Sequence, residues 1–241
     1  MSGHSKWSNI KREKGLKDAK RGAVFTRLGN LIAIAARGGI DPMMNSTLFL
    51  AVEKAKAANM PAANIQRAID RVSDKNAAVM EEIAYEAMGP GGVGIIIETA
   101  TDNRNRTFPE VKNAISKNGG RVADAGSVAF NFTRKGVIRV DATGEDALLT
   151  VLDAGAEDAV EEDGELVVYT ELKDLGKVRS AIIAAGLKVT NAELQFVPNM
   201  MVEVGDVETA QKVLKLLDAL DDLDDVININ SNADITVDLP E

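Results

Sequence analysis

Side chains that suit polyanion binding are concentrated at the start of the chain. Residues 1–27 hold eight Lys or Arg, two acidic residues, and the chain's single Trp and single His. Cations bind phosphates and release condensed counterions, and an indole ring can stack on a nucleobase. The segment therefore predicts nucleic-acid contacts, the alternative being a solvated basic helix. The predicted contact residues here are Lys6, Trp7, Lys11, Arg12, Lys14, Lys17, Lys20, Arg21 and Arg27.

The charge of this segment is opposite to that of the rest of the chain. Residues 1–75 carry a net charge of +8, and residues 76–241 carry −17, so the whole chain stands at −9. A split of this size indicates two roles. The basic part can approach a nucleic acid, whereas the acidic part faces solvent, protein or a basic ribosomal surface.

The conformation of the basic segment has two interpretations. As a helix, residues 6–21 would place Trp7, Lys11, Lys14, Lys17 and Arg21 within a sector of roughly 120°. Gly15 and the lack of capping residues disfavour an isolated helix. An arm that becomes ordered on binding is the second interpretation.

A second basic island lies within the acidic region, in the run D-N-R-N-R-T at 102–107. Arg104 and Arg106 alternate there with asparagines, and Asn and Arg together suit phosphate or base contacts. We therefore add both arginines to the predicted nucleic-acid-binding residues. The alternative is a polar loop between a strand and a helix.

Enzymatic chemistry has little support in this sequence. There is one His and no Cys, and the zinc-protease, serine-hydrolase and P-loop motifs are absent. Clustered carboxylates occur at 157–158, 161–163 and 221–225, but their spacing fits no EF-hand. We expect no catalytic residues, no metal, no cofactor and no small-molecule substrate. An enzyme that uses the acidic domains remains the third alternative.

Residues Gly89–Gly94 match the letters of a dinucleotide-binding fingerprint, G-x-G-x-x-G. That fingerprint needs a helix next, so that the helix N-terminus meets the pyrophosphate. The run Ile95–Ile97 favours a strand instead, and Pro90 removes a backbone donor. The pattern therefore predicts a tight turn between two strands.

Hydrophobic periodicity predicts the elements. Residues 21–75 read as three short helices, the second N-capped by Ser46 and the third with Pro61 near its first turn. Strands are expected at 83–88 and 93–99, a helix from Phe108, and short strands at 121–123 and 127–132. Residues 136–196 follow the order β-α-β-β-α-β. A helix at 207–220 and a strand at 226–229 must dock back, on residues 80–132.

The predicted fold class is α+β with several domains. An N-terminal three-helix bundle precedes two α+β domains, one of which is ferredoxin-like and inserted in the other. The predicted boundaries are 1–78 for the basic arm and bundle, 79–132 with 203–241 for the discontinuous domain, and 133–202 for the inserted domain. With no apolar leader and no apolar run of about 18 residues, neither a signal peptide nor a membrane span is expected.

Specific motifs resemble those of the YebC/PmpR family, also described as translational activators of cytochrome c oxidase. They include G-H-S-K-W at 3–7, D-A-K-R-G at 18–22, N-M-P at 59–61, G-P-G-G at 89–92, T-D-N-R-N-R-T at 101–107, G-S-V at 126–128 and L-D-A-L at 217–220. The resemblance extends over nearly the whole chain. Departures from the family pattern are Glu13, Ile40, Ser46, Phe49 and Met88.

The resemblance implies a cytoplasmic, non-enzymatic regulator with three domains. Members are described as DNA-binding transcriptional regulators, and others as ribosome-associated factors that assist translation of proline-rich stretches. The expected function is therefore DNA-binding transcription regulation. The alternative is a translation factor that uses the same arm on ribosomal RNA. Expected partners are DNA or the ribosome, without a membrane.

Overall fold

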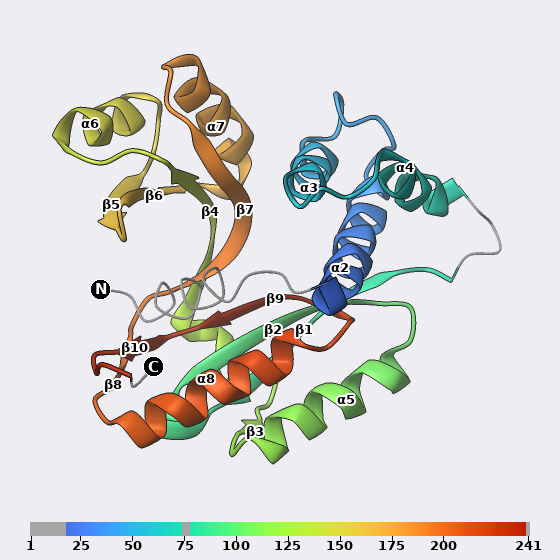
Figure 1. The fold of residues 1–241 in the computed structure, drawn as a ribbon, viewed down its shortest axis with the longest axis vertical. Coiled ribbons are helices and arrows are strands. Elements are labelled where there is room, and N and C mark those ends of the chain that lie inside the picture. Colours follow the sequence, from blue (N-terminus) through green and yellow to red (C-terminus); the bar gives the residue numbers. More distant parts are fainter. Residues whose placement is uncertain (1–17, 74–77, 240–241) are drawn as a thin grey trace. The chain divides into compact units, whose positions relative to one another are not determined.

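The structure is a computed structural model that describes residues 18–73 and 78–239, with side chains from residue 22 onward. Residues 132–199 form one compact unit, and the described residues on either side of them in the sequence form the other. Helices and antiparallel sheets occur together in both units (Figure 1). The predicted α+β class is confirmed, while the exact domain boundaries stay predictions.

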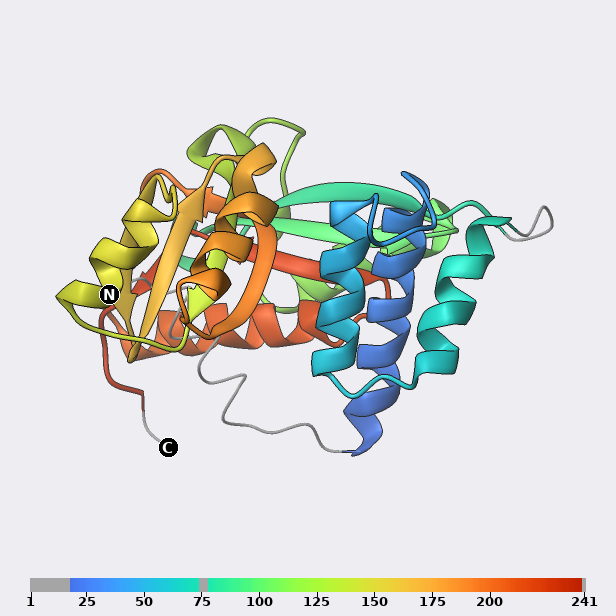
Figure 2. The ribbon, with the colours of Figure 1, turned by 90° about the horizontal axis from the view of Figure 1, so that it is seen from above.

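Three helices form the N-terminal part of the larger unit, as predicted. They are α2 (Asp18–Ala36), α3 (Ser46–Ala57) and α4 (Ala62–Asp70), followed by the short η1 (Arg71–Ser73). Helix α2 lies between α3 and α4 (Figure 2). Their contact is made by small and aliphatic side chains, with Ile32, Leu48 and Ala55 fully buried.

One detail of these helix ends differs from the prediction, while the position of Pro61 agrees with it. The N-cap of α3 is Asn45 rather than Ser46, and its Oδ1 accepts a hydrogen bond from the Leu48 N–H at 3.1 Å. The Asn45 amide also donates to the Ala35 and Gly39 carbonyls at 2.7 and 2.8 Å. An Asn can bond to both sides of the loop, which a Ser hydroxyl is too short to do. Pro61 lies just before α4, at its N-cap position.

A four-stranded antiparallel sheet of order β3-β1-β2-β9 is the centre of the larger unit. The C-terminal segment returns to this sheet, because β9 pairs with β2. Helices α5 and α8 cover one face of the sheet (Figure 1). The bounds are β1 Glu81–Met88, β2 Gly94–Thr101, α5 Arg104–Lys117, β3 Arg121–Val122, α8 Val207–Asp221 and β9 Val226–Ser231.

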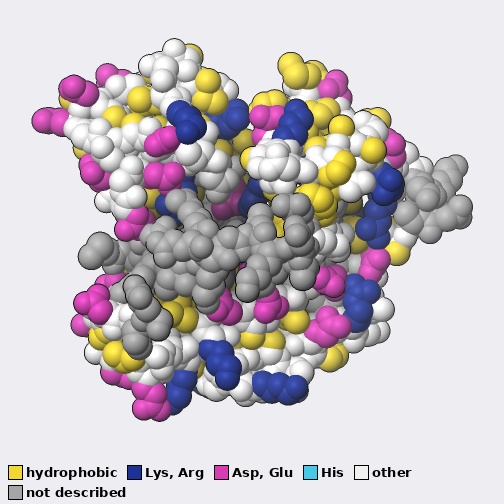
Figure 3. Space-filling view, in the orientation of Figure 1, with side chains coloured by type: hydrophobic (Ala, Val, Ile, Leu, Met, Phe, Trp, Pro, Cys, Tyr) yellow, Lys and Arg dark blue, Asp and Glu magenta, His cyan; other side chains and the backbone are white. Residues whose placement is uncertain are grey.

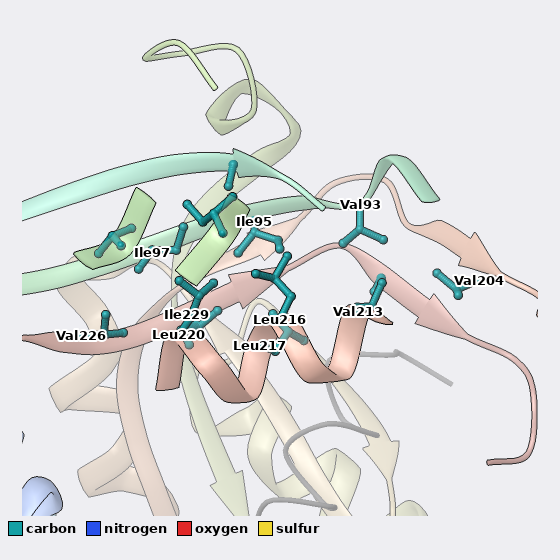
Figure 4. Close-up of a cluster of buried hydrophobic side chains, with 14 of the residues drawn as sticks. Val93, Ile95, Ile97, Val204, Val213, Leu216, Leu217, Leu220, Val226 and Ile229 are labelled. Atoms are coloured by element: carbon teal, nitrogen blue, oxygen red, sulfur yellow. The ribbon is translucent and has the colours of Figure 1, made fainter. Parts of the chain in front are cut away.

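The core of this unit is aliphatic, as the scarcity of aromatic residues requires. Ile95 and Ile97 of β2 face Leu216, Leu217 and Leu220 of α8, and all five are at most 1% exposed (Figure 4). Burying each such side chain contributes about 1.5–3 kcal/mol. Beside the sheet, β8 (Val202–Val204) and β10 (Ala233–Ile235) form a small parallel pair that the sequence did not predict.

The glycine-rich segment between β1 and β2 is a tight turn, as predicted. Its centre is η2 (Pro90–Gly92), where Gly91 and Gly92 have φ values of 71° and 79°. The Gly89 N–H donates to the Val93 carbonyl at 2.7 Å and closes the turn. Strand β2 follows directly, whereas the fingerprint requires a helix to begin there, so the dinucleotide interpretation is not supported.

The predicted strand at 127–132 is wrong. Residues 125–128 form turns, and η3 (Ala129–Asn131) leads into the next strand. The reason is the Glu86 carboxylate of β1, which accepts hydrogen bonds from the N–H groups of Gly126, Val128 and Ala129 at 2.6, 2.6 and 2.8 Å. Burial opposes the charge of Glu86, but these three donors outweigh it and lower the pKa of the carboxyl group.

The smaller unit has the ferredoxin-like order of elements that the sequence predicts. Its antiparallel sheet has the strand order β5-β6-β4-β7, so the first strand lies between the third and the fourth. Gly136 of β4 lies against Leu175 of α7, where a Cβ atom would meet Leu175 Cβ at 3.0 Å. The bounds are β4 Phe132–Val140, α6 Glu145–Asp153, β5 Asp158–Glu162, β6 Glu165–Thr170, η4 Leu172–Asp174, α7 Leu175–Ala184 and β7 Val189–Pro198.

Candidate nucleic-acid interface

Most of the predicted basic arm lies outside the described residues. This applies to Lys6, Trp7, Lys11, Arg12, Lys14 and Lys17. Lys20 and Arg21 belong to the first turns of α2, although their side chains are not described. The structure therefore shows where the arm joins the folded chain: it leads directly into the N-terminus of α2.

Arg27 is engaged inside the protein. Its Nη1 lies 2.7 Å from Asp221 Oδ1, its Nη2 donates to the Asp221 carbonyl, and the two side chains are 15% and 18% exposed. Asp221 is the last residue of α8, and carbonyls at a helix C-terminus attract cations. The contact ties α2, and with it the entry of the arm, to the sheet-bearing part of the same unit.

The second basic island is not a loop, because α5 begins at Arg104. Both arginines lie in the first turn of this helix, and Asn103 caps it by accepting from the Arg106 N–H at 3.2 Å. No acidic residue stands in this first turn, where the helix dipole favours negative charge. The predicted start at Phe108 is four residues too late, because the side chain of Asn103 caps the helix and lets it begin at Arg104.

The missing negative charge comes from a residue far along the chain. Asp225, at the end of the α8–β9 connection, takes two bonds from Arg106 Nη2 at 2.8 and 3.0 Å and one from Thr107 Oγ1 at 2.6 Å. The Asp225 side chain is 8% exposed. This carboxylate raises the pKa of Arg106 through a charge-assisted hydrogen bond. Arg106 is therefore held in place by the fold.

Arg104 is placed differently from Arg106. Its guanidinium is 67% exposed and forms an ion pair with Glu81 of β1, which is 48% exposed. Exposed pairs of this kind contribute about 0–1 kcal/mol and exchange with solvent and ions. Of the predicted residues whose side chains are described, Arg104 is the most exposed.

A pocket of about 330 Å³ opens beside Arg104, between β1 and the start of α5. The rings of Tyr85 and Phe108 lie 5.6 Å apart between centroids, tilted by 38°. Burial raises the pKa of Tyr85, so its hydroxyl group is neutral at physiological pH. The lining residues are Ile83, Tyr85, Arg104, Asn105, Phe108 and Pro109.

The sequence did not predict this pocket. Its parts come from strand β1 and from the start of helix α5, about 20 residues further along the chain. The visible signal was an aromatic residue, Phe108, placed one turn after Arg104. Side chains at i and i+4 of a helix share a face, so the earlier helix start would have brought these two together.

The face of the molecule drawn in Figure 3 shows no continuous basic patch among the described residues. Acidic and basic side chains intermingle over the face seen in Figure 3. Among residues 18–73 and 78–239, no cluster of three or more His, Cys, Asp or Glu is arranged to hold a metal ion. None of the described helices is long and apolar enough to cross a membrane.

Comparison with known proteins identifies the family. Residues 5–75 match the family described as the TACO1/YebC protein N-terminal domain. Residues 80–233 match the one described as the TACO1/YebC second and third domain. The chain therefore belongs to the TACO1/YebC family, as its motifs predict.

Similar proteins extend over essentially the same length. A "Probable transcriptional regulatory protein" of Maridesulfovibrio salexigens is 47% identical over 99% of this chain and 98% of its own. One of Acidithiobacillus ferrooxidans, with the same name, is 50% identical over 98% and 96%. A crystal structure of a conserved hypothetical protein from Aquifex aeolicus matches with a TM-score of 0.85 and 39% identity, over 92% of this chain and 93% of that one.

Proposed function

We propose that this protein is a non-enzymatic, nucleic-acid-binding regulator of gene expression that acts on DNA. The observation that carries the proposal is the charge segregation, +8 in residues 1–75 against −17 in the remainder. The names of the similar proteins, which are called probable transcriptional regulatory proteins, support regulation of transcription. Family membership supports a protein that works without a catalytic centre.

The proposed interface is the basic arm together with the start of α2. Phosphate contacts come from Lys6, Lys11, Arg12, Lys14, Lys17, Lys20 and Arg21, and Trp7 stacks on or wedges between bases. Arg27 and Arg106 each hold a carboxylate of the fold, so we assign them to positioning the interface. Arg104 adds an exposed cation at the sheet-bearing part of the unit.

A second function keeps the same chemistry but changes the target. A ribosome-associated translation factor would place the arm on ribosomal RNA. The acidic remainder of the chain favours this alternative, because ribosomal proteins present basic surfaces to it. Double-stranded DNA has no basic surface that could bind the acidic part of the chain. The two targets are therefore separable by experiment.

The decisive experiment compares the two targets in one salt series. Binding of the full chain to duplex DNA is measured by fluorescence anisotropy, and co-sedimentation with ribosomes is measured in the same buffers. Neutralising about six phosphates predicts a slope of log K against log salt of about −5 on duplex DNA. Saturable ribosome binding together with negligible duplex binding would identify the protein as a translation factor and refute the proposal that it acts on DNA.

Matched charge variants test the arm itself. In one variant Lys11, Lys14 and Lys17 are replaced by Gln, and in the control the same change is made at Lys173, Lys177 and Lys188. Removing three cations from the arm should make the slope shallower by about 3 units, whereas the control should leave it unchanged. Equal effects from both variants would mean that the arm has no special part in binding.

Trp7 is tested separately because it is the chain's single Trp. A stacked base is worth about 1–3 kcal/mol. Trp7→Ala should therefore weaken binding at an unchanged salt slope and leave thermal stability nearly the same. Intrinsic fluorescence reports this position alone, and bound nucleic acid should quench it. A large loss of stability in the variant would assign Trp7 a structural role.

A further inference from the structure

We propose that the pocket between β1 and the start of α5 binds a single unpaired nucleobase of a DNA or RNA strand. This inference rests on the proposed nucleic-acid function and adds a second, chemically different contact to the arm. The pocket lies wholly within the larger unit, and its lining comes from two elements, β1 and α5.

The apolar part of the pocket provides a surface for stacking. Phe108 is 40% exposed although its ring packs against Tyr85 at 5.6 Å, so the inner side of the ring is supported while part of it remains open. Ile83 and Pro109 complete the apolar lining. A ring fixed by a neighbouring aromatic side chain is preorganised to receive the flat face of a base.

The polar part of the pocket suits the edge of the base and the adjoining phosphate. Asn105 is exposed at the pocket, and an amide side chain both donates and accepts hydrogen bonds, as base edges require. Arg104 stands one residue earlier with its guanidinium 67% exposed. A phosphate of the bound nucleotide can replace Glu81 as the partner of this guanidinium.

The charges around the pocket select the type of ligand. Glu81 balances Arg104, so the site has no excess of positive charge that would attract duplex DNA through its backbone. Bases within a duplex are stacked on both faces, and they reach an aromatic side chain only when unpaired or flipped out. The base is therefore the main feature recognised at this site, with one adjoining phosphate beside Arg104, whereas the arm contacts a series of phosphates.

The test uses the full chain and short oligonucleotides that contain one 2-aminopurine, whose fluorescence falls on stacking. Single-stranded DNA, single-stranded RNA and the corresponding duplex are titrated separately. We expect quenching and saturable binding with the single strands. Phe108→Leu, which removes the ring but keeps apolar packing, should weaken that binding about tenfold at an unchanged salt slope. It should leave duplex binding as it was.

Two further variants are expected to change the affinity for single strands in opposite directions. Arg104→Ala should weaken single-strand binding severalfold, whereas Glu81→Gln should strengthen it, because the guanidinium loses its competing carboxylate. Phe130→Ala is the matched control, because Phe130 is an aromatic residue that is 71% exposed outside the pocket. It should change nothing. Melting temperatures of all variants verify that the fold persists.

The outcomes separate this inference from the proposed function. If the three-lysine arm variant loses duplex binding while single-strand quenching persists, both the arm and the pocket are supported. If the full-length protein fails to bind duplex DNA and ribosomes but quenching depends on Phe108, the nucleobase site is supported and the proposed interface of the arm is refuted. Quenching that is indifferent to Phe108→Leu and Glu81→Gln would overturn the nucleobase site and leave the pocket to a protein ligand.

Discussion

The two four-stranded sheets of this protein share a layered design but differ in how the chain builds them. Each sheet is antiparallel and is packed against two helices, α5 and α8 in the larger unit and α6 and α7 in the smaller. The smaller sheet is formed from the continuous stretch 132–198, whereas the larger one joins β1 to β3 with β9, more than 100 residues later. Similar architecture therefore does not imply a similar distribution of long-range contacts.

The difference has consequences for chemistry. In the larger unit, the late return of the chain brings Asp221 to Arg27 and Asp225 to Arg106. The first contact holds α2, and the second holds the first turn of α5. The smaller unit has surface pairs such as Lys188–Asp141, with both partners more than half exposed. Long-range closure of the larger sheet therefore fixes the positions of Arg27 and Arg106.

The largest expected effect concerns the separate cores. Leu216→Ala removes a fully buried side chain of α8 and should cost about 3–5 kcal/mol in the larger unit. Ile182→Ala makes the matching cavity in α7 of the smaller unit. Hydrogen exchange followed by mass spectrometry should show lost protection mainly in the unit that carries the change. Uniform loss in both units from either variant would refute two separate cores.

The next prediction concerns the close packing of β4 against α7. Gly136→Ala would place a Cβ against Thr170 Oγ1 and Leu175, which should destabilise the smaller unit by about 1–3 kcal/mol. Gly22→Ala is the control with the opposite sign. No atom lies within 4 Å of a Cβ at this helical position, so the change should stabilise by up to about 1 kcal/mol. Urea unfolding at 25 °C measures both.

A smaller effect should depend on pH and on one carboxylate of the larger unit. The folded-state pKa of Glu86 is lowered, so its contribution is present above the unfolded value of about 4.3 and is lost as pH falls through the folded value. Glu86→Gln should cost about 1–2 kcal/mol at pH 7, because backbone donors lose their charged acceptor. The difference from the unchanged protein should shrink as pH falls below the unfolded value and should disappear once the carboxyl group is protonated in the folded state as well. A pH-independent difference would contradict this role.

The smallest expected effect on stability comes from two exposed ion pairs, one chosen from each unit. Arg104→Ala in the larger unit should change the free energy of unfolding by less than about 1 kcal/mol. Lys188→Ala in the smaller unit should produce no measurable change. The two variants should differ in ligand binding, since Arg104 alone borders the pocket. A marked loss of stability in Arg104→Ala would mean that its pairing with Glu81 is structural.

Sequence periodicity predicted the elements best where contacts are local. The three N-terminal helices, the turn around Gly91 and the β-α-β-β-α-β order were all correct, because their signals lie within a few residues. The predicted ends of the helices were less accurate. Asn45 and Asn103 are the N-caps of α3 and α5, and in both cases the cap was overlooked in favour of a later residue.

The candidate site shows the same difference between features set by local sequence and features set by long-range contacts. Charge segregation and the arginine-asparagine run are visible in the amino-acid order alone, as is the α+β class. Which arginine is buried is not visible. Arg27, Arg104 and Arg106 look alike in sequence, yet one is paired with Asp221, one is exposed beside an aromatic pocket and one is held by Asp225.

The physical reason is the range of the interactions. Helix and strand patterns depend on neighbours within one or two turns, and net charge depends on composition alone. Both can therefore be read from the amino-acid sequence. The turn at 126–129 and the anchoring of α5 depend instead on the carboxylates of Glu86 and Asp225, about 40 and 120 positions away. Folding is what brings those carboxylates to their donors, and it thereby leaves Arg104 and Phe108 open to a ligand.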